Sequence, residues 1–76
     1  NADNFFSVST LVQNEIVVNA GENYQYVLSN TNGMRISTGS GIKGINRIDV
    51  SRQARGMYII RLFSENQQQT ERIIRQ

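Results

Sequence analysis

The sequence contains no cysteine, histidine, proline or tryptophan. The absence of cysteine excludes disulfide bonds and thiolate metal sites. The absence of histidine removes the side chain that most often acts as a general base near neutral pH. The stability of the fold must therefore come from backbone pairing and apolar burial, and we do not expect the chain to be an enzyme.

Long apolar runs and clustered acidic residues are also missing. No apolar stretch approaches the ~20 residues that span a bilayer as a helix, and "NADNFFSVST" lacks the basic and apolar regions of a signal peptide. The six acidic residues are scattered, so none forms the local pair of a glycosidase or the alternating set of a calcium loop. We expect no catalytic residue, no metal site and no cofactor.

What is present indicates one small β domain. Its 76 residues are below the common domain size of roughly 100–150 residues. Hydrophobic residues make up 38% and charged residues 18%, a balance typical of globular rather than disordered chains. We expect a single domain over residues 1–76.

Positive charge is mild and dispersed, at a net +2. The basic residues lie among acidic ones in the second half of the chain. They are Arg35, Lys43, Arg47, Arg52, Arg55, Arg61, Arg72 and Arg75. Their side chains fit a solvated β surface over which arginine stems cover apolar area. The alternative is a patch that meets an anionic glycolipid or an acidic protein surface.

The first half of the chain alternates in the period of two that is typical of half-buried strands. "FFSVST" and "NEIVVN" predict two short strands, and "NAGEN" predicts a turn in which Gly21 takes a positive φ. In "YQYVL", Tyr24, Tyr26 and Leu28 share one face. This segment is a third strand.

Asn32-Gly33 is the strongest hairpin signal, because both residues accept the positive φ of a tight primed turn. It predicts a hairpin between "YQYVL" and "MRIST". "GSGIKG" follows as a glycine-rich loop. That loop lacks the Gly-Lys-Ser/Thr ending and the following helix of a phosphate-binding loop.

The second half predicts three further strands. "INRIDV" alternates, "GMYIIRLF" is apolar on both faces, and "TERIIR" closes the chain. The double apolar face predicts an inner strand whose second face is partly covered. Between them, "SRQARG" predicts a helical turn that Ser51 caps and Gly56 ends at positive φ. About seven short strands without a long helix favour an all-β antiparallel sandwich over a barrel.

From Val12 to Gln76 the order of these segments resembles a known family. "VQNEIVV" stands for its opening strand, "YVLSNTNGMRI" for its hairpin, "GINRIDVSRQARGMYIIRL" for its middle and "TERIIRQ" for its end. The chain is similar to the type A C-terminal sorting domain of the type IX secretion system, also called the Por secretion system. The prolines usual in the family's opening are absent, and Gln53 replaces an apolar residue.

The resemblance implies an Ig-like antiparallel β-sandwich that acts as a secretion signal. Such domains direct an attached N-terminal cargo protein through the periplasm and across the outer membrane to the cell surface. The implied partners are the outer-membrane translocon, a shuttle protein and a cell-surface sortase. The sortase usually cleaves the domain and attaches the cargo to an anionic lipopolysaccharide.

The resemblance also implies which residues are recognised. They lie in the last two predicted strands and are Gly56, Tyr58, Ile60, Leu62, Arg72, Ile73, Ile74 and Arg75. Arg72 and Arg75 are expected to point at least partly to solvent. Residues 1–6 would be a linker or a cleavage-site remnant next to the cargo. "ERIIRQ" would be an ordered strand and an address, and an edge strand could also pair with a second copy.

Two other function classes remain open from the sequence. Tyr24, Tyr26 and Tyr58 could serve an Ig-like adhesion or carbohydrate-binding module at the end of a surface protein. Buried tyrosines without an aromatic platform at the surface would argue against that module. A nucleic-acid-binding domain is disfavoured, because the basic residues are not clustered on one face with aromatics.

Overall fold

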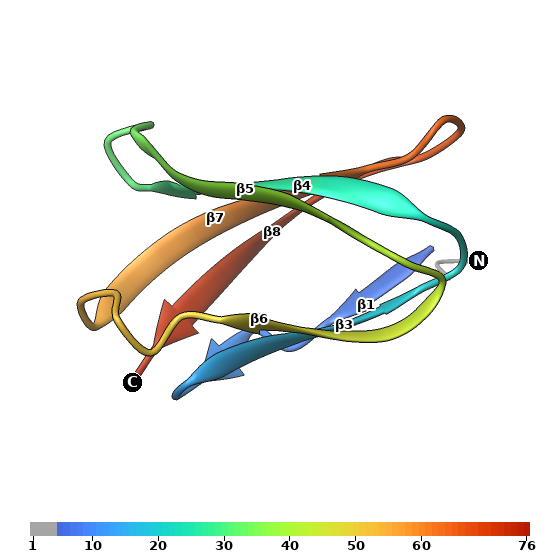
Figure 1. Ribbon diagram of the computed structural model, residues 1–76. Coiled ribbons are helices and arrows are strands. Elements are labelled where there is room, and N and C mark those ends of the chain that lie inside the picture. The colour runs from blue at the N-terminus through green and yellow to red at the C-terminus, as the bar shows by residue number, and fades with distance from the viewer. Residues whose placement is uncertain (1–4) are drawn as a thin grey trace.

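Eight strands in two sheets form the described part of the chain, which is residues 5–76 of a computed structural model (Figure 1). In chain order the strands are β1 (Phe6–Val8), β2 (Leu11–Val12), β3 (Glu15–Ala20), β4 (Tyr24–Asn30), β5 (Arg35–Gly41), β6 (Gly44–Asp49), β7 (Gly56–Phe63) and β8 (Gln68–Arg75). The predicted all-β sandwich is confirmed. One strand more than the expected seven is present, because the opening segment contains the short β2. None of the described residues forms a helix long and apolar enough to cross a membrane.

The strands divide into a sheet of three and a sheet of five. The smaller sheet has the order β1-β3-β6, and the larger has the order β2-β8-β7-β4-β5. Every pair is antiparallel except β2 with β8, which is parallel. Figure 1 shows the two sheets as facing layers, with the chain crossing from β5 into β6 and from β6 back into β7.

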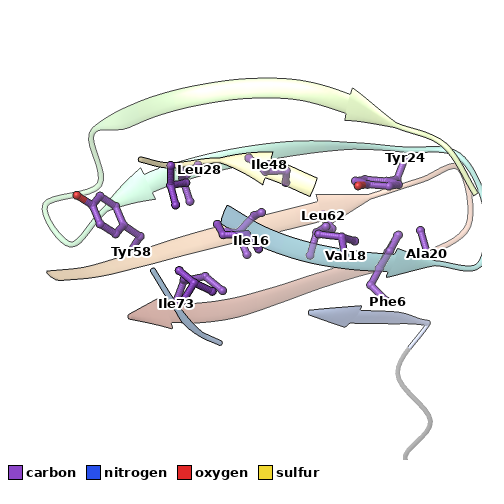
Figure 2. Packing of buried hydrophobic residues seen from close by; sticks show 13 residues of the cluster. Phe6, Ile16, Val18, Ala20, Tyr24, Leu28, Ile48, Tyr58, Leu62 and Ile73 are labelled. Atoms are coloured by element: carbon purple, nitrogen blue, oxygen red, sulfur yellow. The ribbon is translucent and has the colours of Figure 1, made fainter. Parts of the chain in front are cut away.

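The core lies between the two sheets. It is built by the alternate residues of each strand that point inward, as period-two patterning requires. Side chains from both sheets converge there (Figure 2). The buried cluster is Phe6, Val12, Ile16, Val18, Ala20, Tyr24, Leu28, Ile48, Val50, Tyr58, Ile60, Leu62 and Ile73.

The β4–β5 hairpin forms as predicted, but its turn is different. Only Gly33 has a positive φ, at 84°, and Asn32 does not, so the predicted two-residue primed turn is wrong. The Gly33 N–H donates to the Asn30 carbonyl, and Asn30 Oδ1 accepts from the N–H groups of Asn32 and Met34. A three-residue loop with glycine at its left-handed position results.

The predicted loop "GSGIKG" is wrong over its first three residues, because Gly39–Gly41 belong to β5. Gly39 pairs with Tyr26, and Gly41 pairs with Tyr24. A Cβ at either glycine would overlap the paired tyrosine ring, so the two aromatic rings require glycine opposite them. Gly21 is free to take a positive φ but does not have one. A Cβ there would lie 2.7 Å from the ring of Phe5.

The segment before β7 makes a β-turn instead of the predicted helical turn. The Gln53 N–H donates to the Val50 carbonyl at 3.0 Å, which closes four residues. Gly56 then starts β7 with a φ of 142°, so its predicted positive φ is confirmed. This backbone bend lets the Tyr58 hydroxyl donate back to the Ala54 carbonyl.

The expected linker, residues 1–6, falls mostly outside the described residues, since its first four positions are not among them. Phe6 is fully buried and begins β1. Its N–H donates to Gln69 Oε1 of β8, and its carbonyl accepts from Gln69 Nε2 at 2.7 Å. Phe6 is therefore part of the folded sandwich.

Candidate functional site

Four of the eight expected recognition residues lie inside the sandwich. Ile60 and Leu62 are 0% exposed, Ile73 is 1% exposed and Tyr58 is 8% exposed. They pack in the core, and Figure 2 shows Tyr58, Leu62 and Ile73 among the buried side chains. In the folded domain their side chains form the scaffold of β7 and β8.

Arg75 was expected to point at least partly to solvent, and its side chain is half-buried and forms two hydrogen bonds within the chain. Its Nε donates to the Val50 carbonyl at 3.0 Å, and one of its terminal nitrogens donates to the Ser51 carbonyl at 3.2 Å. These acceptors lie just beyond the end of β6, which belongs to the other sheet. Arg75 thus links the two sheets at one end of the sandwich.

Arg72 and Ile74 are the two expected recognition side chains that remain open to solvent. Both point away from the core, and Ile74 is 41% exposed. Ile74 pairs with Met57 of β7 on one side and with Leu11 of β2 on the other. Arg72 pairs with Ile59. The strand register therefore places them in a larger surface.

We call this surface the outer face of the five-stranded sheet. Its members point away from the core and come from all five strands of this sheet. They are Leu11, Val27, Ser29, Arg35, Met57, Ile59, Arg61, Thr70, Arg72 and Ile74. Met57 and Ile59 are 42% and 38% exposed, and Phe63 on the same face of β7 is half-buried, so the second face of "GMYIIRLF" is only partly covered. The double apolar pattern was the signal that could have located this face.

The outer face carries arginines without a compensating carboxylate. Arg35, Arg61 and Arg72 all project from it and are exposed. Among residues 5–76, Glu65 lines a groove together with Arg61 near the β7–β8 turn, but no acidic side chain forms an ion pair with these three arginines. Glu15 and Asp49 are on the smaller sheet, Glu22 and Glu65 are in turns, and Glu71 pairs with the buried Ile60. The face is therefore positive.

A shallow groove of about 340 Å³ crosses the middle of this face. Val27 and Ile59 contribute apolar side chains to it, and Arg35 and Arg61 contribute positive charge. Arg61 also lies over the ring of Phe63, 5.9 Å from its centroid. The groove offers apolar contact together with charge, which suits binding better than catalysis. Within residues 5–76, no cluster of three metal-ligating side chains occurs.

The tyrosines form no exposed platform among the described residues. Tyr24 and Tyr58 are 3% and 8% exposed, and Tyr26 is half-buried against the core. Burial raises the pKa of the Tyr24 phenol, and the neighbouring Tyr26 raises it further. These side chains are structural, so the observation that would have favoured a carbohydrate-binding module is missing.

The comparison with protein families places the chain. A family described as "Secretion system C-terminal sorting domain" matches residues 12–76. This range begins in β2 and includes all of β3 to β8. Comparisons with curated proteins and with solved structures give no significant match.

Proposed function

The chain belongs to the family of secretion system C-terminal sorting domains, which are signals of type IX secretion, and on this basis we propose that it directs an attached N-terminal cargo protein across the outer membrane. The observation that carries the proposal is the family match over residues 12–76. A folded sandwich and the lack of catalytic or metal-ligating clusters within the described residues fit a signal domain better than an enzyme.

The route and the partners are part of the proposal. The domain passes through the periplasm, meets a shuttle protein and the outer-membrane translocon, and is then recognised and cleaved by a cell-surface sortase. Residues 1–76 act as one sorting domain, and the cargo precedes it. Self-pairing of the domain through an edge strand such as β5, whose one partner among the strands of residues 5–76 is β4, would be an additional contact.

We assign different roles to the eight proposed recognition residues. Tyr58, Ile60, Leu62 and Ile73 act indirectly, because they are buried and hold β7 and β8 in register. Gly56 and Arg75 fix the end of β7 and the junction of the two sheets. Arg72 and Ile74 are the pair that a receptor can touch.

A secretion assay tests this assignment. A soluble reporter with its own export signal carries the chain at its C-terminus in a host with type IX machinery. We expect the reporter to reach the surface, and we expect it to remain in the periplasm without the chain. Arg72→Gln combined with Ile74→Thr should slow secretion while the melting temperature of the domain stays nearly unchanged, because both side chains are exposed.

The smaller sheet supplies the matched control. Ile45 is 66% exposed, and Arg47 is exposed and paired with Glu15 at 2.6 Å. Ile45→Thr combined with Arg47→Gln changes the same residue types and should leave secretion unchanged. A reporter retained in the periplasm even with the unaltered chain would refute the proposed function. Normal secretion of the Arg72/Ile74 variant would refute only the assignment of those two residues.

A further inference from the structure

Four exposed apolar side chains are contiguous on the outer face of the five-stranded sheet. Leu11, Ile74 and Met57 form one row across β2, β8 and β7. Ile59 follows Met57 by two residues on the same face. They are 61%, 41%, 42% and 38% exposed, respectively. Exposed apolar residues scattered singly need no explanation, but a contiguous group marks an interaction site.

The other exposed apolar side chains do not form such a group. Met34 lies in the β4–β5 turn and Ile42 in the β5–β6 connection. Ile45 lies on the smaller sheet beside Asn19, and the next pair there is Arg47 with Val17. Arg47 is neutralised by Glu15. The combination of an apolar cluster with uncompensated arginines is specific to the five-stranded sheet.

The arginines of this face limit what can cover it. The side chains of Arg35, Arg61 and Arg72 have no hydrogen bond or ion pair to any of residues 5–76, although the Arg61 guanidinium lies over the Phe63 ring. A second copy docked face to face would bring these like charges together. The occupant must therefore be both anionic and apolar.

Charge and apolar area are distributed differently over the face. The apolar row occupies the β2-β8-β7 side, whereas the arginines extend from Arg72 on β8 across to Arg35 on β5. Long arginine side chains that are not held by neighbours can follow laterally mobile headgroups while apolar side chains enter below them. A protein partner with fixed carboxylates would gain more from arginines held in place. The family's task also brings the domain to an outer membrane.

We propose that the outer face of the five-stranded sheet binds an anionic lipid surface. Leu11, Met57 and Ile74 enter the boundary between headgroups and acyl chains, and the three arginines contact phosphate groups. This binding goes beyond the proposed secretion signal and does not depend on it, because it needs no secretion machinery. It would hold the domain flat against the membrane, with the smaller sheet facing away.

Sedimentation with lipid vesicles tests the proposal on the full 76-residue chain. Vesicles of phosphatidylcholine with phosphatidylglycerol should bind the chain, and vesicles of phosphatidylcholine alone should bind it weakly. Replacing Arg35, Arg61 and Arg72 with Gln should weaken binding at least about tenfold, since each basic residue near an anionic surface contributes to attachment. Met57→Thr combined with Ile74→Thr should also weaken binding to the anionic vesicles, although it leaves the net charge of the chain unchanged.

Two control variants match these changes off the face. Replacing Arg47, Arg52 and Arg55 with Gln removes the same charge, and Ile42→Thr with Ile45→Thr removes two apolar side chains that are more exposed than Met57 and Ile74. Both should bind like the unaltered chain, and circular dichroism melts should show that all variants are folded. A folded chain that ignores anionic vesicles would overturn the proposal. Equal loss in control and test variants would also overturn it, and so would preference for an acidic polypeptide without any vesicle binding.

Discussion

Two buried tyrosines differ in whether their hydroxyl groups form a hydrogen bond. Tyr58 and Tyr24 are both buried, but only the Tyr58 hydroxyl has a protein partner, the Ala54 carbonyl. The Tyr24 hydroxyl has none among residues 5–76. A buried polar group without a partner costs stability, whereas a satisfied one contributes about 1 kcal/mol.

Tyr58→Phe should therefore lower the free energy of unfolding by about 1 kcal/mol, which corresponds to a melting temperature roughly 4–8 °C lower. Tyr24→Phe should leave the melting temperature unchanged or raise it. Thermal melts of the two variants measure this difference directly. If Tyr24→Phe destabilised the domain as much as Tyr58→Phe, the two hydroxyls would have to be equally satisfied.

The buried Tyr24 phenol should make the stability of the fold depend on pH in the alkaline range. Burial raises the pKa of its phenol in the folded chain above the unfolded value near 10. The folded state therefore holds this proton more tightly than the unfolded state does. Its stability contribution is complete below about pH 10 and is lost as pH rises through the higher folded pKa. Melts between pH 8 and 11 should show this decline, and Tyr24→Phe should reduce it.

At the scale of strands, the two arginines of β8 have opposite tasks. Arg75 donates to two carbonyls near the end of β6, whereas Arg72 has no bonded partner among the described residues. Arg75→Gln should cost about 1–3 kcal/mol, because it removes hydrogen bonds from a charged donor. Arg72→Gln should change stability by less than about 0.5 kcal/mol. Urea unfolding of both variants measures this difference in stability. Equal midpoints would contradict a stabilising role for the Arg75 hydrogen bonds.

Strand β5 gives a prediction that opposes ordinary strand propensity. Alanine normally stabilises a strand relative to glycine by roughly 0.5–1 kcal/mol. Gly41→Ala should do the reverse, because its Cβ would overlap the Tyr24 ring, which is only 3% exposed and packs in the core. Gly39→Ala should cost less, since the opposing Tyr26 is half-buried and can shift. Thermal melts that rank the two variants the other way would show that the rings can move.

Element patterns explain which parts of the fold were predictable. Strict alternation in "YQYVL" and the Asn-Gly signal located β4 and the hairpin, because a period of two has a direct geometric meaning. The glycines of β5 led to a wrong prediction of a loop. Glycine is needed there because tyrosine rings lie opposite it on β4, and only the strand register shows this. The prediction of a helical turn at "SRQARG" was wrong for a similar reason. The Tyr58 hydroxyl donates a hydrogen bond to the Ala54 carbonyl, and the chain bends at Gly56.

The proposed recognition residues come from the family resemblance, and the structure divides them into buried and exposed ones. Sequence alone could not tell that Arg75 turns toward Val50 while Arg72 stays open, because both flank the same Ile-Ile pair. Leu11 was missed for another reason. Its place beside Ile74 depends on a parallel pairing between segments far apart in the chain, which no local pattern encodes.

At the scale of the whole molecule, one core and several ties join the two sheets. Gln69 is hydrogen-bonded to the Phe6 backbone, and Arg75 donates hydrogen bonds to the Val50 and Ser51 carbonyls. The buried cluster contains side chains from both sheets. Neither sheet can bury its inner face without the other. The chain should therefore unfold as one unit.

Far-ultraviolet circular dichroism and tyrosine fluorescence should report the same thermal midpoint, with a single sigmoidal transition. Circular dichroism should show sheet and no substantial helix. Two separated midpoints would mean that one sheet persists alone, which the shared core argues against. The Arg75→Gln variant provides a second check, because loosening one tie should lower both midpoints together.

The contacts that join both ends of the chain affect the order in which the domain can fold: β2 pairs with β8, and Phe6 of β1 is hydrogen-bonded to Gln69 of β8. Phe6 and Gln69 are 63 positions apart in the chain, so the sandwich cannot close until its last strand has been synthesised. Folds with such distant pairings form slowly compared with folds built from local contacts. Until the last strand is present, the apolar inner faces of both sheets stay exposed, so this interval is when the polypeptide is most open to aggregation.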